Sequence, residues 1–257
     1  MEPVITFTTD FGTRDGYTAQ MKGVVLGICP GARLIDVTHD IRPYAILEGA
    51  LVLNAVSRHF PEGTIHVGVV DPGVGGPRRE MALNAGNRFY VGPDNGLFSF
   101  IFDSCQPWEA RAISNSDYML PDPHPTFHGR DVFSATAAHL CAGRPFDLVG
   151  PPIQDPVRLN LPQAFQSQDG IRGQIIYVDR FGNLTSNISA QMLTRKARSI
   201  EVGNLVIQGI RRFFGEVSEG EPLALINSFG FLEIAVNMRD ASEVLDLRTG
   251  ADVRLLW

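Results

Sequence analysis

A buried strand that stops at an acidic turn is the feature that most constrains the fold of this chain. Residues 64–70 form the apolar run Thr-Ile-His-Val-Gly-Val-Val, which is typical of a strand covered on both faces. The run ends at Asp71-Pro-Gly, where proline removes a backbone donor and glycine permits a positive φ. Asp71 is therefore predicted at a strand tip, the edge where open α/β sheets bind their ligands.

Strands and helices alternate around this run. Strands are predicted at 4–9 and 34–37, and helices at 21–28, 45–60 and 132–142. Residues 81–84 and 88–91 predict a hairpin around Ala85-Gly86-Asn87. The alternation predicts an α/β N-terminal domain with a mostly parallel central sheet and helices on its faces.

The composition changes in the second half of the chain. The segment Gly150-Pro-Pro-Ile-Gln-Asp-Pro156 is the best candidate for a linker. Short strands are predicted beyond it at 173–178, 199–202, 205–207, 223–226, 231–236 and 253–256. Short strands between Gly- and Asn-bearing turns predict an all-β barrel or sandwich. We expect an α/β domain over 1–160 that carries the catalytic residues, and a β domain over 161–257 that completes the ligand site.

Composition limits the partners and the location. The chain has 257 residues, 44% hydrophobic and 19% charged, so it can bury a core, and no apolar stretch is long enough to span a membrane. Its first strand begins without a signal-like segment, so we expect a cytoplasmic protein. A net charge of −6 without basic runs argues against nucleic acid and anionic membranes as partners. Cys29, Cys105 and Cys141 lack metal-ligand spacing.

Three polar side chains at element boundaries form a candidate catalytic set. Arg78 lies across a glycine-rich loop that can fold back toward Asp71. His128 lies just before the third predicted helix. A carboxylate, a guanidinium and an imidazole in one pocket suit acid–base chemistry. Taken singly, each also fits a structural role, Asp71 in a turn and His128 at a helix start.

Other segments carry candidate binding groups. Asp10 at a strand end and Asp15 near a helix start could accept hydrogen bonds from a ribose diol, or Asp15 could cap the helix. Tyr44 could stack on a base or pack the start of the next helix. Residues 179–187 and 227–231 are dense in hydrogen-bonding groups and also fit plain turns.

Taken together, these segments resemble the S-adenosyl-L-methionine (SAM) hydroxide adenosyltransferases, relatives of fluorinating and chlorinating enzymes. The resemblance spans nearly the whole chain and is carried by Thr9-Asp-Phe-Gly, Asp15, Asp71-Pro-Gly-Val-Gly with Arg78, Thr126-Phe-His-Gly-Arg-Asp131, Asp179-Arg-Phe-Gly-Asn183 and Asn227-Ser-Phe-Gly-Phe. It implies an N-terminal α/β domain, a C-terminal β-barrel and a homotrimer with active sites at subunit interfaces. It also implies cleavage of SAM by water to adenosine and methionine, with SAM as substrate and no cofactor or metal.

The resemblance also assigns the catalytic residues. The family's Asp, Arg and His fall on Asp71, Arg78 and His128, and the seven-residue step selects Arg78 over Arg79. Halogenating relatives carry an aromatic in place of both Asp71 and His128, Ser in place of Gly129, and a long insertion near 84–88. These differences favour water over halide as the nucleophile.

The binding residues follow from the same resemblance. The carboxylate that holds the ribose falls on Asp10, with Asp15 as a neighbour, and Tyr44 matches an aromatic beside the sugar and base. The barrel residues on the methionine and adenine side are Asp179, Phe181, Asn183 and Ser228. Phe229 stands where halogenating relatives use an Arg, so the sequence does not identify the residue that binds the methionine carboxylate.

The sulfonium makes methionine a good leaving group, so the difficulty is to place a water behind C5′ and take its proton. Asp71 is expected to accept that proton or orient the water, with His128 as the competing base and Arg78 stabilising the developing hydroxide. Three alternatives stay open: a halide-dependent adenosyl halogenase, a nucleoside- or SAM-binding protein without turnover, and a metal hydrolase that uses Asp10, Asp71, His128 and Asp131.

Overall fold

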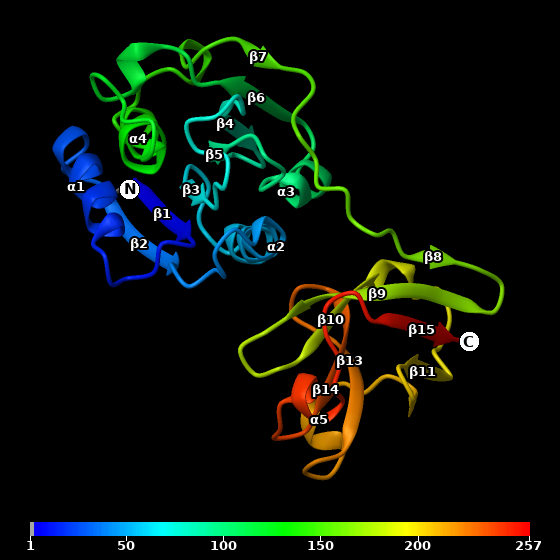
Figure 1. The fold of residues 1–257 in the computed structure, drawn as a ribbon. Helices are drawn as coiled ribbons and strands as arrows, with labels where there is room; N and C mark the ends of the chain where they lie inside the picture. The colour runs from blue at the N-terminus through cyan, green and yellow to red at the C-terminus, as the bar shows by residue number, and fades with distance from the viewer. Residues whose placement is uncertain (1–2) are drawn as a thin grey trace. The chain divides into compact units, whose positions relative to one another are not determined.

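The computed structural model describes residues 3–257. Contacts within the chain divide it into two compact units, Met1–Leu159 and Asn160–Trp257, each with its own sheet (Figure 1). No helix in the described part of the chain combines the length and the apolar character needed to cross a membrane.

The first unit is an α/β unit. Its elements are β1 (Val4–Thr9), α1 (Tyr17–Ile28), β2 (Arg33–Thr38), α2 (Ile46–Ser57), β3 (Ile65–Val69), β4 (Glu80–Ala85), β5 (Arg88–Pro93), α3 (Ser99–Ser104), β6 (Trp108–Ala112), η1 (Ser116–Tyr118), the π-helical η2 (Gly129–Ser134), α4 (Ala135–Cys141), η3 (Phe146–Leu148) and β7 (Pro152–Ile153).

The sheet of the first unit is mixed, so the prediction of a mostly parallel sheet was wrong. The strand order is β2-β1-β3-β5-β4-β6-β7. The pairs among β2, β1, β3 and β5 are parallel, whereas β4, β6 and β7 add antiparallel pairs. The cause is the predicted hairpin, which is confirmed: Gly86 and Asn87 both have φ of 57°, and a two-residue turn of this kind reverses the chain.

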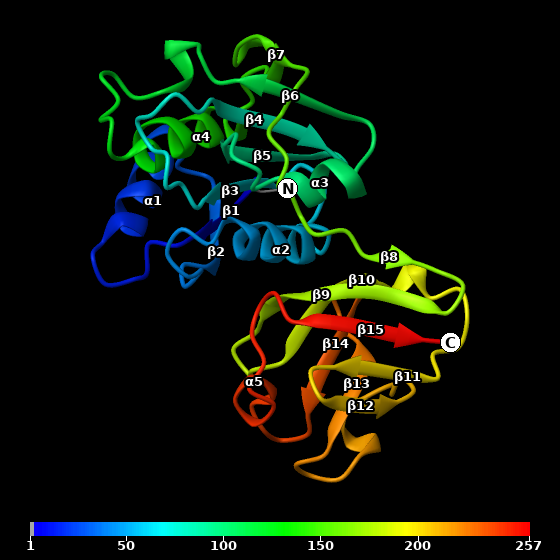
Figure 2. The same cartoon turned by 45° about the vertical axis from the view of Figure 1, so that its right-hand side comes forward.

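Helices cover both faces of this sheet. α1 and α4 pack on one face, where Phe7, Met21 and Val132 belong to one buried cluster. α2 and α3 cover the other face, where Leu53 and Phe102 belong to a second cluster (Figure 2). Because β1 and β3 are covered on both faces, their side chains are almost all buried, and the strand tips are left as the route to solvent.

The second unit is a nearly closed β-barrel, which confirms the prediction of a β-rich second half. Its elements are β8 (Phe165–Gln166), β9 (Gly170–Val178), β10 (Leu184–Ser189), η4 (Ala190–Met192), β11 (Ser199–Val202), β12 (Leu205–Gln208), η5 (Phe214–Glu216), β13 (Pro222–Ile226), β14 (Phe231–Val236), α5 (Ala241–Val244) and β15 (Asp252–Leu256). The strand order is β12-β11-β15-β9-β10-β14-β13, and an isolated bridge from Arg211 to Leu225 joins the two ends. The sequence reading missed β10, which lies within the segment interpreted as a turn.

Candidate active site

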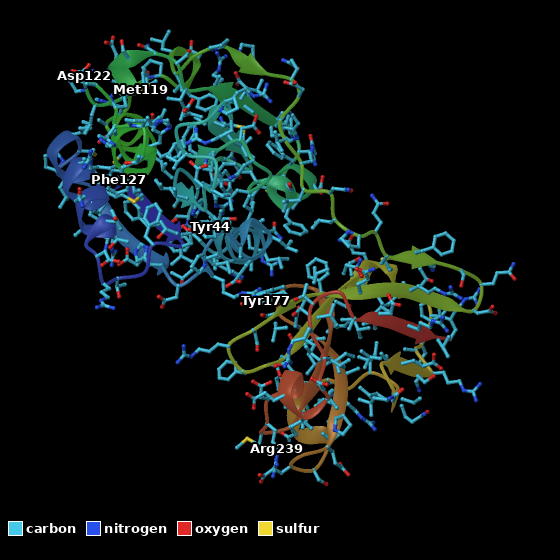
Figure 3. All side chains as sticks on the ribbon, in the orientation of Figure 1. Tyr44, Met119, Asp122, Phe127, Tyr177 and Arg239 are labelled. Atoms are coloured by element: carbon cyan, nitrogen blue, oxygen red, sulfur yellow. The ribbon has the colours of Figure 1, made fainter. Side chains whose placement is uncertain are left out.

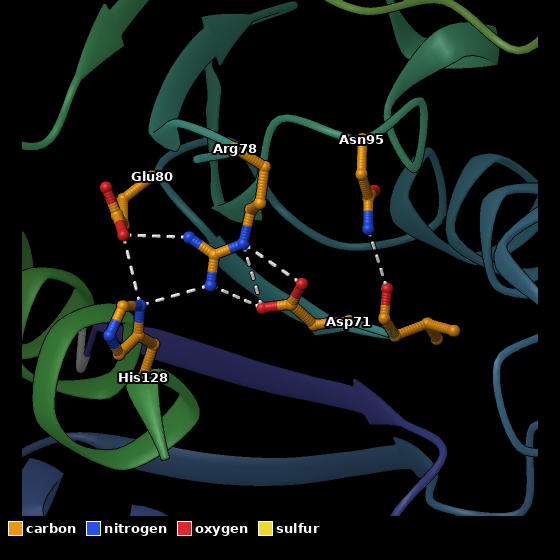
Figure 4. Close-up of polar contacts among 6 residues, drawn as sticks. Asp71, Arg78, Glu80, Asn95 and His128 are labelled. Atoms are coloured by element: carbon orange, nitrogen blue, oxygen red, sulfur yellow. Dashed lines mark hydrogen bonds and ion pairs between the residues drawn. The ribbon is translucent and has the colours of Figure 1, made fainter. Parts of the chain in front are cut away.

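Asp71 and Arg78 form a two-pronged ion pair at the tip of β3. Arg78 Nε donates to Asp71 Oδ1 at 3.0 Å, and Nη2 donates to Oδ2 at 2.5 Å (Figure 4). Only 4% of the Asp71 side chain and 10% of the Arg78 side chain are exposed. Burial lowers the pKa of Arg78, but its contacts with Asp71 and Glu80 outweigh that effect and raise it above the ordinary value. The loop therefore folds back as the sequence predicted.

His128 completes the group, although it is 50 positions from Arg78 in the sequence. Its Nδ1 lies 3.1 Å from Arg78 Nη2 and 3.0 Å from Glu80 Oε1, while Arg78 Nη1 donates to the same Glu80 oxygen at 2.8 Å (Figure 4). His128 directly precedes η2, a π-helical turn in which the Ser134 hydroxyl donates to the Gly129 carbonyl at 2.8 Å. The predicted helix thus begins earlier than expected, and its first turn is wider than an α-helix, a feature often found at functional sites.

A cavity of about 420 Å³ opens beside this group. Asp71 and His128 line it, while Arg78 and Glu80 are not among its lining residues. Three aromatic rings form one wall, Phe11, Tyr17 and Phe127, with Tyr17 and Phe127 centroids 5.3 Å apart. A carboxylate and an imidazole therefore face a cavity that is partly lined by aromatic rings, a combination typical of small-molecule sites.

Two neighbouring side chains brace the catalytic loop. Asn95 donates from Nδ2 to the Val70 carbonyl at 2.9 Å and so holds the strand end that precedes Asp71 (Figure 4). Arg79 turns to the other side and pairs with Asp94 at 2.7 Å and Asp155 at 2.7 Å. The two adjacent arginines therefore form ion pairs with different carboxylates, and Arg78 is the one that pairs with Asp71.

Asp10 and Tyr44 lie together near the same strand tips. The Tyr44 N–H donates to Asp10 Oδ2 at 2.9 Å, and the Tyr44 side chain is 73% exposed, so it does not pack the start of α2 (Figure 3). Asp10 and Asp71 follow the paired ends of β1 and β3, where Thr9 lies opposite Val69. Burial raises the pKa of Asp10, and the charge of Asp71 adds to the rise.

Asp15 is not brought into this group. Its side chain is exposed, and it is not among the residues that line the cavity. The alternative role as a helix cap is wrong, because Gly16 holds the cap position of α1 and no side chain caps that end.

The barrel residues assemble around a second cavity of about 410 Å³, within the second unit. Asp179 shapes the turn before β10, since its Oδ1 accepts from the N–H groups of Phe181 at 2.9 Å and Asn183 at 2.8 Å. Phe181 is 75% exposed and, with Asp179, Asn183 and Ser228, lines this cavity. All four predicted barrel residues therefore meet in one place.

The second cavity also holds groups that the sequence reading missed. Glu233 is buried and accepts from Asn227 Nδ2 at 2.9 Å. Burial raises the pKa of Glu233, and the charge of Asp179 adds to the rise. Arg212 lies on the rim, paired with Glu216 at 3.0 Å. Phe229 lines the cavity as well. The cavity thus combines two carboxylates, a guanidinium and aromatic rings.

The metal-hydrolase alternative needed Asp131 beside Asp10, Asp71 and His128. Asp131 instead pairs with Arg130 at 2.6 Å and accepts the His124 N–H at 2.9 Å. Among residues 3–257, no group of His, Cys, Asp or Glu side chains has the arrangement of a metal site.

Glu80 is the residue of the first site that the sequence reading missed. No signal in the sequence pointed to it, because Arg78 lies in the loop before β4 and Glu80 is only the first residue of that strand. Arg212 also carried no signal, since it lies in a turn region between β12 and β13.

The α/β unit with a charged cavity and the β-barrel unit together define a class, which comparison with known proteins identifies. The chain matches the model of the SAM hydroxide adenosyltransferase N-terminal domain over residues 5–150 and that of the C-terminal domain over residues 173–254. The chain belongs to the SAM hydroxide adenosyltransferase family, which confirms the resemblance seen in the sequence.

Individual relatives agree with this family. A protein named (R)-S-adenosyl-L-methionine hydrolase from Thermus thermophilus is 38% identical over 270 residues, with 100% of both chains covered. A fluorinase from Actinoplanes sp. is 31% identical, with 98% of this chain and 96% of that protein covered. The crystal structure of an uncharacterized conserved protein from Thermotoga maritima superimposes with a TM-score of 0.91 at 33% identity, covering 98% of this chain and 100% of the other.

Proposed function

We propose that this chain is a SAM hydrolase, which cleaves SAM to adenosine and L-methionine by attack of water at C5′ of the ribose. The observation that carries the proposal is the convergence of Asp71, Arg78 and His128 within hydrogen-bond distance, with Asp71 and His128 on the cavity wall. The hydrolase relative is also more similar to this chain than the fluorinase is, at 38% against 31% identity.

The chemistry needs a positioned water and a base rather than an acid, because the positive sulfur leaves as neutral methionine. In our proposal the carboxylate and the imidazole hold the water in line with the C5′–S bond. Arg78 would hold Asp71 in place by its two-pronged bond and stabilise the negative charge that develops on the water oxygen.

Further proposed roles concern binding. Asp10 would accept hydrogen bonds from the ribose hydroxyls, and the exposed Tyr44 ring would lie against the sugar and base. In the barrel, Asp179, Asn183 and Ser228 would bind polar groups of methionine and adenine, and Phe181 would supply a stacking face. We also propose that the reaction needs no cofactor or metal and takes place in the cytoplasm.

Product analysis tests the activity. The protein is incubated with SAM in buffer and in 1 M chloride after treatment with a chelator, and products are separated by chromatography. Equal amounts of adenosine and methionine, unaffected by chloride or chelator, are expected. A 5′-chloro-nucleoside would support the halogenase instead, and saturable SAM binding without methionine release would support a binding protein.

The homotrimer with active sites at subunit interfaces is a further proposal, supported by the family resemblance. Light scattering measures the oligomeric state, and three chains of 28.2 kDa are expected. Two inactive variants, Asp71→Asn and Asp179→Ala, are then mixed, dissociated and reassembled. If one site takes Asp71 and Asp179 from different subunits, mixing restores part of the activity; if each site uses one chain, activity stays lost.

A further inference from the structure

Glu80 is held against both Arg78 and His128, yet it does not line the cavity in which the reaction is proposed to occur. One of its two carboxylate oxygens, Oε1, makes both contacts: it lies 2.8 Å from Arg78 Nη1 and 3.0 Å from His128 Nδ1. Its side chain is 25% exposed, against 13% for His128. A charged carboxylate at this distance from an imidazole controls where the ring carries its proton.

The two contacts of His128 Nδ1 require different protonation states. A guanidinium only donates and an ionised carboxylate only accepts. Nδ1 can accept from Arg78 when it is bare, or donate to Glu80 when it carries hydrogen, but it cannot do both at once. In the first state Nε2 carries the hydrogen of the neutral ring, so Nε2 has no lone pair with which to accept a proton from water. In the second state Nε2 is a free base.

The charge of the cluster favours the second state. Asp71 and Glu80 are two carboxylates that share one guanidinium, so the group has one excess negative charge. Arg78 already donates to both carboxylates and does not depend on His128 for a partner. Glu80 Oε1 can accept from Arg78 Nη1 and from His128 Nδ1–H at the same time, because a carboxylate oxygen has two lone pairs.

We propose that Glu80 is a positioning residue that holds the proton on His128 Nδ1, so that Nε2 is the atom that takes the proton from the attacking water. This inference rests on the proposed function. As the water oxygen forms its bond to C5′, one O–H bond breaks and its proton moves to Nε2, while the C5′–S electron pair leaves with methionine. The imidazolium that results donates from Nδ1 to Glu80, in the manner of the carboxylate–histidine pair of serine hydrolases.

The surroundings of His128 contain other charged or titratable groups. Asp71, His124 and Arg130 line the same cavity, and Asp10 lies near Asp71. On β3, which packs against η2, burial lowers the pKa of His66 to about 3, so His66 stays neutral in the range of interest. On α1, which also packs against η2, Lys22 is paired with Asp36 at 2.6 Å. Glu80 and Arg78 are thus the charges in direct contact with the ring.

The test is the steady-state kinetics of SAM cleavage by Glu80→Gln. Glutamine keeps an oxygen that can accept from Nδ1 but removes the charge. We expect kcat to fall at least tenfold and KM to change less than threefold. Glu109→Gln, which removes an exposed carboxylate from neighbouring β6, is the matched control and should leave both unchanged.

A second measurement separates this role from general support of the fold. In a His128→Asn background, Glu80→Gln should lower kcat less than twofold further, since Glu80 acts through the lost imidazole. An unchanged kcat in the single variant, or a further tenfold loss in the double variant, overturns the proposal. If the unaltered protein releases no methionine, the proposed function itself fails, so the two failures are distinguishable.

Discussion

The backbone N–H of Tyr44 and the carboxylate of Asp10 are joined by a 2.9 Å hydrogen bond, although 34 positions separate them. Tyr44 has a φ of 69°, a conformation that glycine adopts without strain and that costs other residues about 1 kcal/mol. The structure thus holds the Tyr44 backbone in an unfavourable state beside Asp10 while the ring is left in solvent, which argues that the ring has a use there.

Tyr44→Gly removes the ring but keeps the backbone conformation at position 44, so the variant tests the role of the ring alone. We expect the stability of the protein to hold or rise slightly, because glycine keeps the hydrogen bond to Asp10 and relieves the strain. The KM for SAM should rise tenfold or more, since stacking of an aromatic on a base contributes roughly 1–3 kcal/mol. Asp246→Gly, at an exposed position with φ of 50°, is the control for strain relief alone. An unchanged KM would remove Tyr44 from the binding site.

Asp71→Asn and His128→Ala test the proposed catalytic group. Each should lower kcat by about 10²–10⁴-fold, the usual contribution of a positioned acid or base. Adenosine affinity, measured by calorimetry, should change little, which shows that the cavity is intact. Asp155→Asn, which removes a carboxylate from the neighbouring Arg79, is the matched control. Normal turnover in both variants would exclude the group from the mechanism.

The fold could be predicted well where the signal is local. β1, β11 and β14 have the predicted bounds or nearly so, because their apolar runs are short and end at Gly, Asn or Asp. The hairpin of β4 and β5 was visible in its turn residues. Its consequence for the sheet was not, because strand order depends on which edges pair in space, and local patterns do not encode that choice.

The site could be predicted only in part, for the same reason. Asp71, Arg78 and His128 were identified by their positions at element boundaries and by family motifs, and the structure brings the three together. Glu80 is absent from those motifs, and only its distances to Arg78 and His128 reveal it. Asp15 shows the opposite case, since its sequence position suggested a cap while the chain turns at Gly16 instead.

Arg212 is expected to help hold the negatively charged end of methionine in the second cavity. Phe229 lines this cavity without a charge, and Arg212 supplies the guanidinium at its rim. Arg212→Gln should raise the Kd for SAM by about three- to tenfold and leave that for adenosine unchanged, as measured by calorimetry. Arg248→Gln, an exposed arginine elsewhere in the barrel, is the control. Equal losses for SAM and adenosine would contradict this role.

His66 should make the protein sensitive to acid. It is 1% exposed, bonded to Thr6 Oγ1 at 2.7 Å and stacked on Tyr90, and burial, with Arg88 adding, lowers its pKa to about 3. Between pH 6.5 and 3 the His66 side chain is protonated in the unfolded chain and neutral in the folded chain. The free energy of unfolding therefore falls as the pH falls, by up to about 1.4 kcal/mol per pH unit.

His66→Gln should remove this acid sensitivity. Urea unfolding at pH 7 and pH 5 should show the unaltered protein losing about 2 kcal/mol more than the variant over this interval. His59→Gln changes an exposed histidine and should follow the unaltered protein. Parallel losses in His66→Gln and the unaltered protein would mean that other groups cause the acid response.

Gly129 tests the packing that supports the catalytic cavity. A Cβ at this position would lie 3.3 Å from ring atoms of both Phe11 and Phe127, which line the cavity. Gly129→Ser should therefore displace these rings, lower the free energy of unfolding by about 1–3 kcal/mol and reduce kcat/KM for SAM severalfold. Gly23→Ala, in the middle of α1 with nothing within 4 Å of its Cβ, should instead stabilise the protein by about 0.5–1 kcal/mol through helix propensity. Thermal unfolding and initial rates measure both effects. A serine variant with the stability and activity of the unaltered protein would show that the two rings move freely and do not shape the cavity.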